Sequence, residues 1–158
     1  MNRIALLLPA VVIMVSCAAS NDAVEVRNLE VVRAVFSEIW SKGNVDLITD
    51  LFSEDFVGHF PAAETVHGHE GLAAQVIAHR RAFPDWTEEV EDEILDGDRV
   101  AIRFTSRGTN METLLGNPPT GKSVAITEVA VFKLVNGKIS EQWVYPDILS
   151  LQRQLELE

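Results

Sequence analysis

The sequence has little that could cross-link the chain or bind a polyanion. Its 158 residues include one cysteine, Cys17, so no disulfide can form within the chain. Only 13 residues are basic against 24 acidic ones, a net charge of −11. Such a surface repels phosphate backbones and anionic membrane faces. We therefore expect no nucleic-acid partner, and no membrane contact except through an attached lipid.

The chain also has only one long apolar run, and it lies at the amino terminus. A basic start precedes an apolar stretch from Ile4 to Val15, which is the pattern of a secretory signal. The run is shorter than the roughly 20 residues that a spanning helix needs. This excludes a conventional transmembrane anchor at this position.

The single cysteine follows this run directly. Met14-Val15-Ser16-Cys17 resembles the lipobox of bacterial lipoproteins, whose cysteine is acylated and becomes the new first residue. We therefore predict a signal peptide over residues 1–16, a lipid on Cys17, a tether over 17–23 and one folded domain over 24–158. These features predict an exported protein that is lipid-anchored in the bacterial cell envelope. A soluble periplasmic or secreted protein is the alternative.

The first half of the domain has helical periodicity. From Val24 to Lys42 apolar residues recur every three or four positions, and Gly43 ends the pattern. Asn44 can cap a second short helix. The patterns predict helices over 24–42, 44–51 and 68–83, with a short strand over 55–60.

After Pro84 the apolar period changes to two, which is typical of strands with one wet face. Asp96-Gly97-Asp98 and Asn136-Gly137 are strong turn signals. We predict strands over 86–94, 99–109, 123–135 and 138–145, and a closing helix over 148–155. The fold class is therefore α+β. We expect a cone-shaped, curved antiparallel sheet, a half-barrel, with N-terminal helices and a C-terminal helix enclosing a small-molecule pocket.

One motif suggests nucleotide binding, but its context argues against it. Gly116–Ser123 matches the phosphate-loop pattern, which requires a following helix and free backbone N–H groups. Pro118 and Pro119 remove two of those donors, and Val124–Leu134 has the composition of a strand. We interpret the segment as a loop.

Four histidines raise the question of a metal site. His67 and His69 would share a face in an extended segment, and zinc needs three such ligands that converge. Gly68 between them predicts a turn instead, and we expect no metal. His59 is retained as a candidate site residue, because it lies beside Phe56 where the first strand meets the expected pocket.

The last strand carries the strongest chemical signal. Alternation puts Glu141, Trp143, Tyr145 and Asp147 on one face. If Trp143 faces the pocket, Asp147 lies on the same wall, and desolvation raises the pKa of a buried carboxyl toward a value useful for proton transfer. Asp147 also precedes a helical segment, so a role as its N-cap is an equal alternative.

Together these segments resemble the SnoaL-like polyketide cyclases of the nuclear transport factor two-like superfamily, over about residues 29–155. The resemblance rests on a series of short motifs in a fixed order. They are Phe56-Val57-Gly58-His59, Gly68-His69-Glu70-Gly71, Phe83-Pro84-Asp85-Trp86, Asp96-Gly97-Asp98-Arg99-Val100, Arg107-Gly108-Thr109, Leu115–Lys122, Asn136-Gly137-Lys138-Ile139, Glu141, Trp143 and Asp147.

The resemblance implies an α+β barrel closed at one end by helices. The family's cyclases close a ring by an intramolecular aldol reaction without a metal or cofactor, and the aspartate matching Asp147 is their general acid/base. We thus expect cofactor-free acid/base chemistry of the cyclase, isomerase or hydrolase kind on a small, apolar carbonyl compound. The expected site residues are Asp147 and His59 for catalysis, and Trp143, Tyr145, Trp86, Phe56 and Glu128 for the substrate pocket.

Two positions depart from the family pattern. The strand segment Thr127–Phe132 lacks the histidine that many of these cyclases carry, and Asn110 stands where relatives have another histidine. Glu128 is the residue of that strand that could face the pocket instead. The alternatives to an enzyme are a lipid-tethered binding module without chemistry, and a structural domain. The resemblance also implies a homodimer that pairs through the outer face of the sheet.

Overall fold

The computed structural model describes residues 12–61, 65–114 and 116–157, with side chains described from residue 22 onward. The predicted signal peptide and the lipidation site at Cys17 therefore lie outside the residues whose side chains are described. Among the helices described, none has the length and apolar character to cross a membrane.

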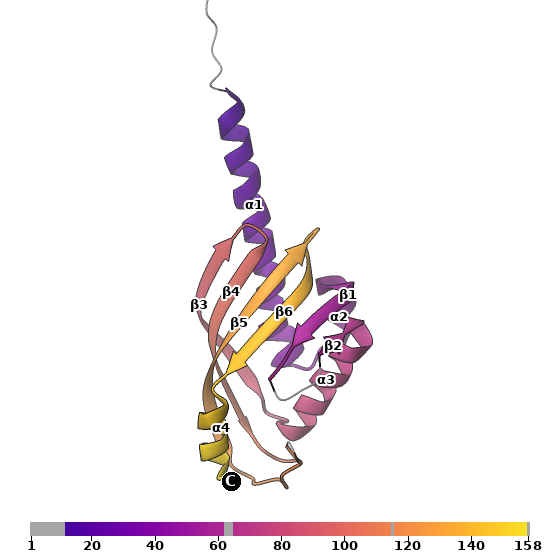
Figure 1. The fold of residues 1–158 in the computed structure, drawn as a ribbon, viewed down its shortest axis with the longest axis vertical. Helices are drawn as coiled ribbons and strands as arrows, with labels where there is room; N and C mark the ends of the chain where they lie inside the picture. Colours follow the sequence, from indigo (N-terminus) through magenta and orange to yellow (C-terminus); the bar gives the residue numbers. More distant parts are fainter. Residues whose placement is uncertain (1–11, 62–64, 115, 158) are drawn as a thin grey trace, which may run out of the picture.

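The helices flank a single sheet (Figure 1). The first helix, α1, passes directly into the π-helical segment η1, and the short η2 and α2 follow. Helix α3 precedes the long strands and α4 closes the chain. Their bounds are α1 Val12–Ala34, η1 Val35–Trp40, η2 Val45–Leu47, α2 Ile48–Leu51, α3 Gly68–Ala82 and α4 Ile148–Leu155.

The sheet has six strands in the order β2-β1-β6-β5-β4-β3. The strands are β1 Phe52–His59, β2 Val66–His67, β3 Thr87–Asp96, β4 Arg99–Thr109, β5 Ser123–Val135 and β6 Lys138–Pro146. The last four form the antiparallel meander that the sequence predicts. In the turn between β5 and β6, Asn136 and Gly137 both have positive φ (53° and 75°), as a two-residue hairpin loop of type I′ requires.

The sheet is mixed rather than purely antiparallel, which corrects one part of the prediction. β1 runs parallel to β6, with Val57 opposite Glu141 and His59 opposite Trp143. Helices and the long meander separate these two strands in the chain, so no local sequence signal specifies their pairing. Two boundaries are also corrected: the first helix begins at Val12 rather than Val24, and the first strand begins at Phe52 rather than Asp55. The short strand β2 was not predicted.

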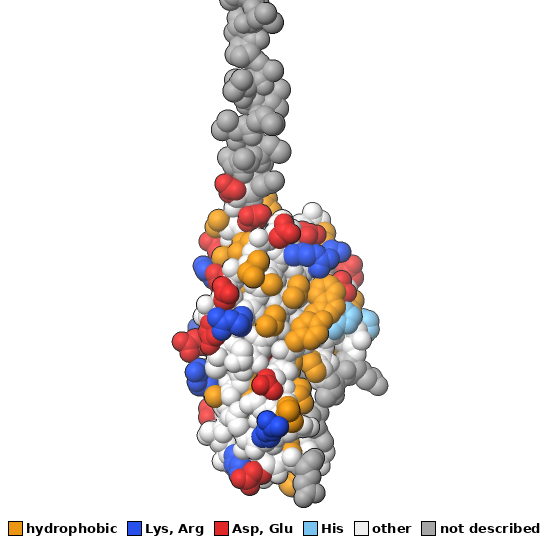
Figure 2. All heavy atoms as spheres, turned by 60° about the vertical axis from the view of Figure 1, so that its left-hand side comes forward, with side chains coloured by type: hydrophobic (Ala, Val, Ile, Leu, Met, Phe, Trp, Pro, Cys, Tyr) orange, Lys and Arg blue, Asp and Glu red, His pale blue; other side chains and the backbone are white. Residues whose placement is uncertain are grey.

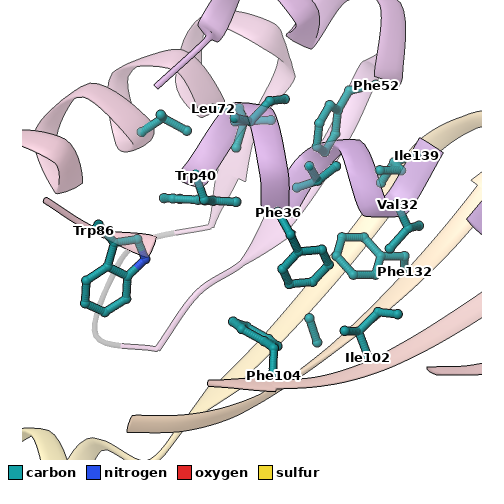
Figure 3. Close-up of a cluster of buried hydrophobic side chains, with 14 of the residues drawn as sticks. Val32, Phe36, Trp40, Phe52, Leu72, Trp86, Ile102, Phe104, Phe132 and Ile139 are labelled. Atoms are coloured by element: carbon teal, nitrogen blue, oxygen red, sulfur yellow. The ribbon is translucent and has the colours of Figure 1, made fainter. Parts of the chain in front are cut away.

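The helices cover one face of the sheet, and the core lies between them. η1 packs on β3, α4 on β5 and α3 on β1. Phe36 of η1 is at the centre of the core: its ring meets Phe104 edge-on at 4.7 Å between centroids and Phe132 at 5.8 Å (Figure 3). The opposite, outer face of the sheet has no covering element among the described residues.

Candidate active site

A cavity of about 180 Å³ lies between the helices and the inner face of the sheet. Its walls are mainly apolar, with aliphatic side chains from β5, β6 and α4 and six aromatic rings. These rings belong to Phe36, Trp40, Phe60, Phe83, Trp86 and Phe104. The π-helical turn that follows α1 contributes two of them, and such turns are frequent at functional sites.

Unpartnered polar atoms are concentrated on this cavity. Five buried side-chain nitrogen or oxygen atoms of the described residues have no hydrogen-bond partner. Four of them belong to residues that line the cavity: His79 Nε2, Glu88 Oε2, Glu128 Oε1 and Gln142 Oε1. The fifth is the hydroxyl of Ser106, which stands on β4 opposite Glu88. Buried polar groups are almost always paired in proteins, so this cluster indicates a place for a ligand.

Glu128 is the most enclosed acid of the cavity. It stands on β5 between Phe104 of β4 and Pro146 of β6, and only 7% of its surface is exposed. Loss of hydration raises the pKa of its carboxyl to about 7. Glu128 can therefore accept or release a proton near neutral pH.

Glu88 is the second acid, and it is held in place from two directions. The indole N–H of Trp86 donates to its Oε1 at 3.1 Å, and its own backbone N–H donates to the hydroxyl of Ser41 at 3.0 Å. The residue as a whole is half-buried, but its Oε2 has no contact with solvent. Burial first, and then the negative charge of Glu128, raise the pKa of Glu88 well above its ordinary value.

His79 reaches the cavity from α3 and is packed in aromatic rings. Its imidazole lies 4.5 Å from the Trp86 ring centroid and 5.5 Å from that of Trp40. Burial, with a smaller contribution from the charge of Arg80, lowers the pKa of His79 to about 4. The ring is therefore neutral at physiological pH, and it can accept or donate one hydrogen bond without carrying a charge.

The structure places two of the expected pocket residues on the cavity wall, Trp86 and Glu128. Phe56 lies elsewhere: it is fully buried in the apolar core, with its ring 4.8 Å from that of Phe52, and does not line the cavity.

The alternation expected along the last strand is present, but the cavity is on the other side of it. Gln142, Val144 and Pro146 line the cavity. Trp143 and Tyr145 therefore project to the outer face, which corrects their expected place in the pocket. The large apolar ring of Trp143 is partly covered on the outer face by His59 and Arg99.

His59 lies on that outer face with Trp143. Its ring stacks on the indole at 5.3 Å with an interplanar angle of 12°, and its Nε2 is 3.0 Å from Oε1 of Glu141. The guanidinium of Arg99 lies over the same indole, 5.9 Å from its centroid. His59 is thus on the opposite side of the sheet from the cavity acids, which corrects its expected position.

Asp147 is exposed and caps the last helix. Its Oδ1 accepts a hydrogen bond from the backbone N–H of Ser150 at 2.9 Å. The neighbours Pro146 and Ile148 line the cavity, but Asp147 does not. Of the two alternatives drawn from the sequence, the observed geometry is that of the N-cap.

The structure also bears on the phosphate-loop pattern at Gly116–Ser123 and on the histidines considered as metal ligands. The segment that resembles a phosphate loop leads into the strand β5 and not into a helix. Across the parts of the chain that the structure describes, no three histidine, cysteine or acidic side chains are grouped as metal ligands.

Sequence reasoning did not place four polar residues of the cavity wall in the pocket: Gln75, His79, Glu88 and Gln142. The sequence did contain a signal for Glu88. Residues 86, 88 and 90 lie on the same face of a strand, so Glu88 is an acid on the face that carries the apolar Trp86 and Val90. His79 likewise belongs to the apolar face of its helix.

Comparisons with known proteins agree with this architecture. The family model described as SnoaL-like polyketide cyclase matches residues 30–155. Aklanonic acid methyl ester cyclase DnrD of Streptomyces peucetius is 27% identical over 122 residues, covering 75% of this chain and 83% of that protein. Its counterpart DauD of Streptomyces sp. strain C5 is 26% identical over 122 residues, covering 75% of each chain.

Solved structures extend the similarity to the whole fold. A protein from Jannaschia sp. CCS1, assigned as a SnoaL-like polyketide cyclase, has a TM-score of 0.79 at 26% identity, covering 85% of this chain and 95% of its own. IdmH of Streptomyces antibioticus, assigned as a polyketide cyclase, has a TM-score of 0.71 at 28% identity, covering 82% and 99%.

Proposed function

Because the chain belongs to the SnoaL-like polyketide cyclase family, we propose that it is a cofactor-free acid/base catalyst acting on a small, largely apolar carbonyl compound. The observation that carries the proposal is a pair of carboxyl groups, Glu88 and Glu128, in one desolvated cavity. Each has a buried oxygen, Oε2 of Glu88 and Oε1 of Glu128, that has no hydrogen-bond partner. Catalytic sites are where such groups are retained despite their cost.

The two acids differ in environment, and this difference assigns their roles. Glu128, with a pKa of about 7, supplies a carboxylate as general base. Glu88, whose pKa is raised further by the charge of Glu128, stays protonated and acts as the acid. Environments that separate two pKa values in this way are the usual basis of paired acid/base catalysis.

In a ring closure of the aldol type these roles give a balanced sequence. Glu128 removes a proton from the carbon next to a carbonyl group, and the resulting enolate carbon attacks a second carbonyl carbon of the same molecule. One C–C bond forms, and the second oxygen takes the proton of Glu88. Glu128 then releases its proton to water and Glu88 takes one up from water, which restores both groups. The cavity contributes by holding the two reacting carbons together.

The proposal is tested with nitrobenzisoxazole, a small bicyclic probe whose ring opens when a base removes one proton. Glu128→Gln should lower the rate of opening at least about 100-fold, the usual contribution of a positioned base. The rate of the unchanged protein should rise about tenfold per pH unit up to the pKa of about 7 and then level off, because only the carboxylate form reacts.

The matched control is Asp147→Asn, which removes a carboxylate but keeps a good N-cap. We expect its rate to stay within about twofold of the unchanged protein, as a role limited to capping implies. A large loss in Asp147→Asn with little loss in Glu128→Gln would assign catalysis to Asp147 and reject the proposal. Ligand binding without any base-catalysed opening would favour the non-catalytic binding module.

For localisation we propose that the protein is exported and carries a lipid on Cys17. The support is the sequence pattern of Ile4–Cys17 and the absence of any other cysteine. When cells are fed an alkyne-tagged fatty acid, the protein should be labelled and sediment with membranes. Cys17→Ser should abolish the label. Equal labelling of both forms would contradict the proposal.

We also propose a homodimer that pairs through the outer face of the sheet. Apolar side chains gather across the middle of that face, with charged ones around them (Figure 2). Val129 and Tyr145 are 38% and 61% exposed there, and exposed apolar patches mark interaction sites. Sedimentation should give twice the chain mass, and Val129→Glu should shift it to the monomer. A monomeric unchanged protein would contradict the dimer.

A further inference from the structure

We infer that the substrate is an uncharged ester or ketone of one or two rings, with oxygen groups at two or more places on the molecule. The inference rests on the proposed function only in taking the cavity as the substrate site. It is narrower than that function, because size, charge and polar pattern each exclude a class of ligand.

The size of the cavity sets the upper limit. An apolar protein cavity of about 150 Å³ accommodates a molecule the size of benzene. The volume here is about 180 Å³, which suits one substituted ring or two fused rings. The walls are close-packed parts of the core: Phe104 also contacts Phe36 at 4.7 Å (Figure 3), so the cavity cannot widen there without disturbing the core. A molecule of three or more fused rings exceeds the space that the described residues enclose.

The charge of the walls excludes acids. Among the described residues that line the cavity, none is a lysine or an arginine. Their ionisable members are Glu88, Glu128 and His79, and the last of these is neutral at physiological pH. A carboxylate or phosphate ligand would be buried without a counter-charge and beside the acid Glu128, which is costly. A cationic ligand would pair with Glu128 and occupy the proposed base. Uncharged ligands avoid both problems.

The polar groups stand on different sides of the cavity, and this fixes the pattern of the ligand. His79 is on α3, Glu88 on β3, Glu128 on β5 and Gln142 on β6. Strand β4 lies between β3 and β5, so these two strands are two strand spacings apart, about 10 Å. A ligand with one polar end would leave most of these atoms unpaired, whereas oxygen groups at two places can reach both acids.

The test uses three synthetic probes and titration calorimetry at pH 8: the methyl ester of hydroxynaphthoic acid, the free acid, and the methyl ester of the three-ring hydroxyanthracene analogue. The two-ring ester should bind, the free acid at least about 30-fold more weakly, and the three-ring ester at least about tenfold more weakly. No measurable binding of the two-ring ester, or equal binding of all three probes, would overturn the inference.

Two variants separate the causes. Leu151→Ala removes a side chain of the cavity wall and should recover binding of the three-ring ester. Leu155→Ala removes the same side chain from the same helix, but from a buried position outside the cavity, and should not. Glu128→Gln should reduce the preference for the ester over the free acid to less than about threefold, because the repelling charge is gone. An unchanged preference would reject the charge argument.

These readouts are independent of the base test. If the ester binds selectively while nitrobenzisoxazole is not opened, the substrate class stands and catalysis falls. If nitrobenzisoxazole is opened but the free acid and the three-ring ester bind as well as the two-ring ester, the base stands and the substrate class falls.

Discussion

Replacing Glu128 by glutamine is expected to make the folded protein more stable at pH 8 and to leave its stability nearly unchanged near pH 4.5. The folded-state pKa of about 7 lies above the ordinary 4.5 of a glutamate. A raised pKa stabilises the fold below the ordinary pKa, and that stabilisation is lost as the pH rises through the folded-state value. At about 1.4 kcal/mol per pKa unit, ionisation of Glu128 costs the unchanged protein on the order of 3 kcal/mol between the two pH values, and the variant lacks this contribution.

Urea unfolding at pH 4.5, 6 and 8 measures this difference, since glutamine has the size of glutamate but no titrating proton. Glu89→Gln is the matched control. Glu89 follows Glu88 on β3, its side chain is exposed, and its ion pair with Arg107 is at the surface. Its effect should stay within about 0.5 kcal/mol at every pH. If Glu128→Gln is no more stable than the unchanged protein at pH 8, the carboxyl is not desolvated.

Phe36→Ala is expected to be the most damaging substitution in the core, with a loss of about 3–5 kcal/mol in the free energy of unfolding. Phe36 is buried, and its ring holds the helical layer to two strands through the edge-on contacts with Phe104 and Phe132. Its removal also merges a new void with the cavity, which the surrounding sheet cannot close.

Urea unfolding with tryptophan fluorescence gives the magnitude. Phe36→Leu should cost less, because leucine keeps most of the apolar volume. A loss below about 1 kcal/mol for the alanine variant would mean that the helical layer is held to the sheet elsewhere.

Most of the fold could be predicted from local signals. The meander follows from period-two alternation over Arg99–Thr109 and Ser123–Val135, together with the turn at Asn136-Gly137. The parallel pairing of β1 with β6 could not be predicted in this way. It joins His59 to Trp143 across a long stretch of chain, and only the packing of the whole domain determines it.

The candidate site could be predicted only in part, because a strand's alternation gives two faces without saying which is buried. Trp143 and Tyr145 share one face, as predicted, but Gln142 lies on the cavity side. An aromatic ring is a weak guide to the inside when a histidine can stack on it. Glu88 and Glu128 are acidic residues on the faces of their strands that carry core residues. They were the better guide, because acidic side chains are seldom buried without a partner.

The central claim, that a carboxyl in the cavity titrates near neutral pH, is tested most directly by a carbon NMR titration of the glutamate carboxyl groups. The signal that disappears in Glu128→Gln identifies Glu128. We expect that signal in the unchanged protein to titrate with a midpoint at about 7. A midpoint near the ordinary value of 4.5 would contradict the desolvated site, and with it the proposed base.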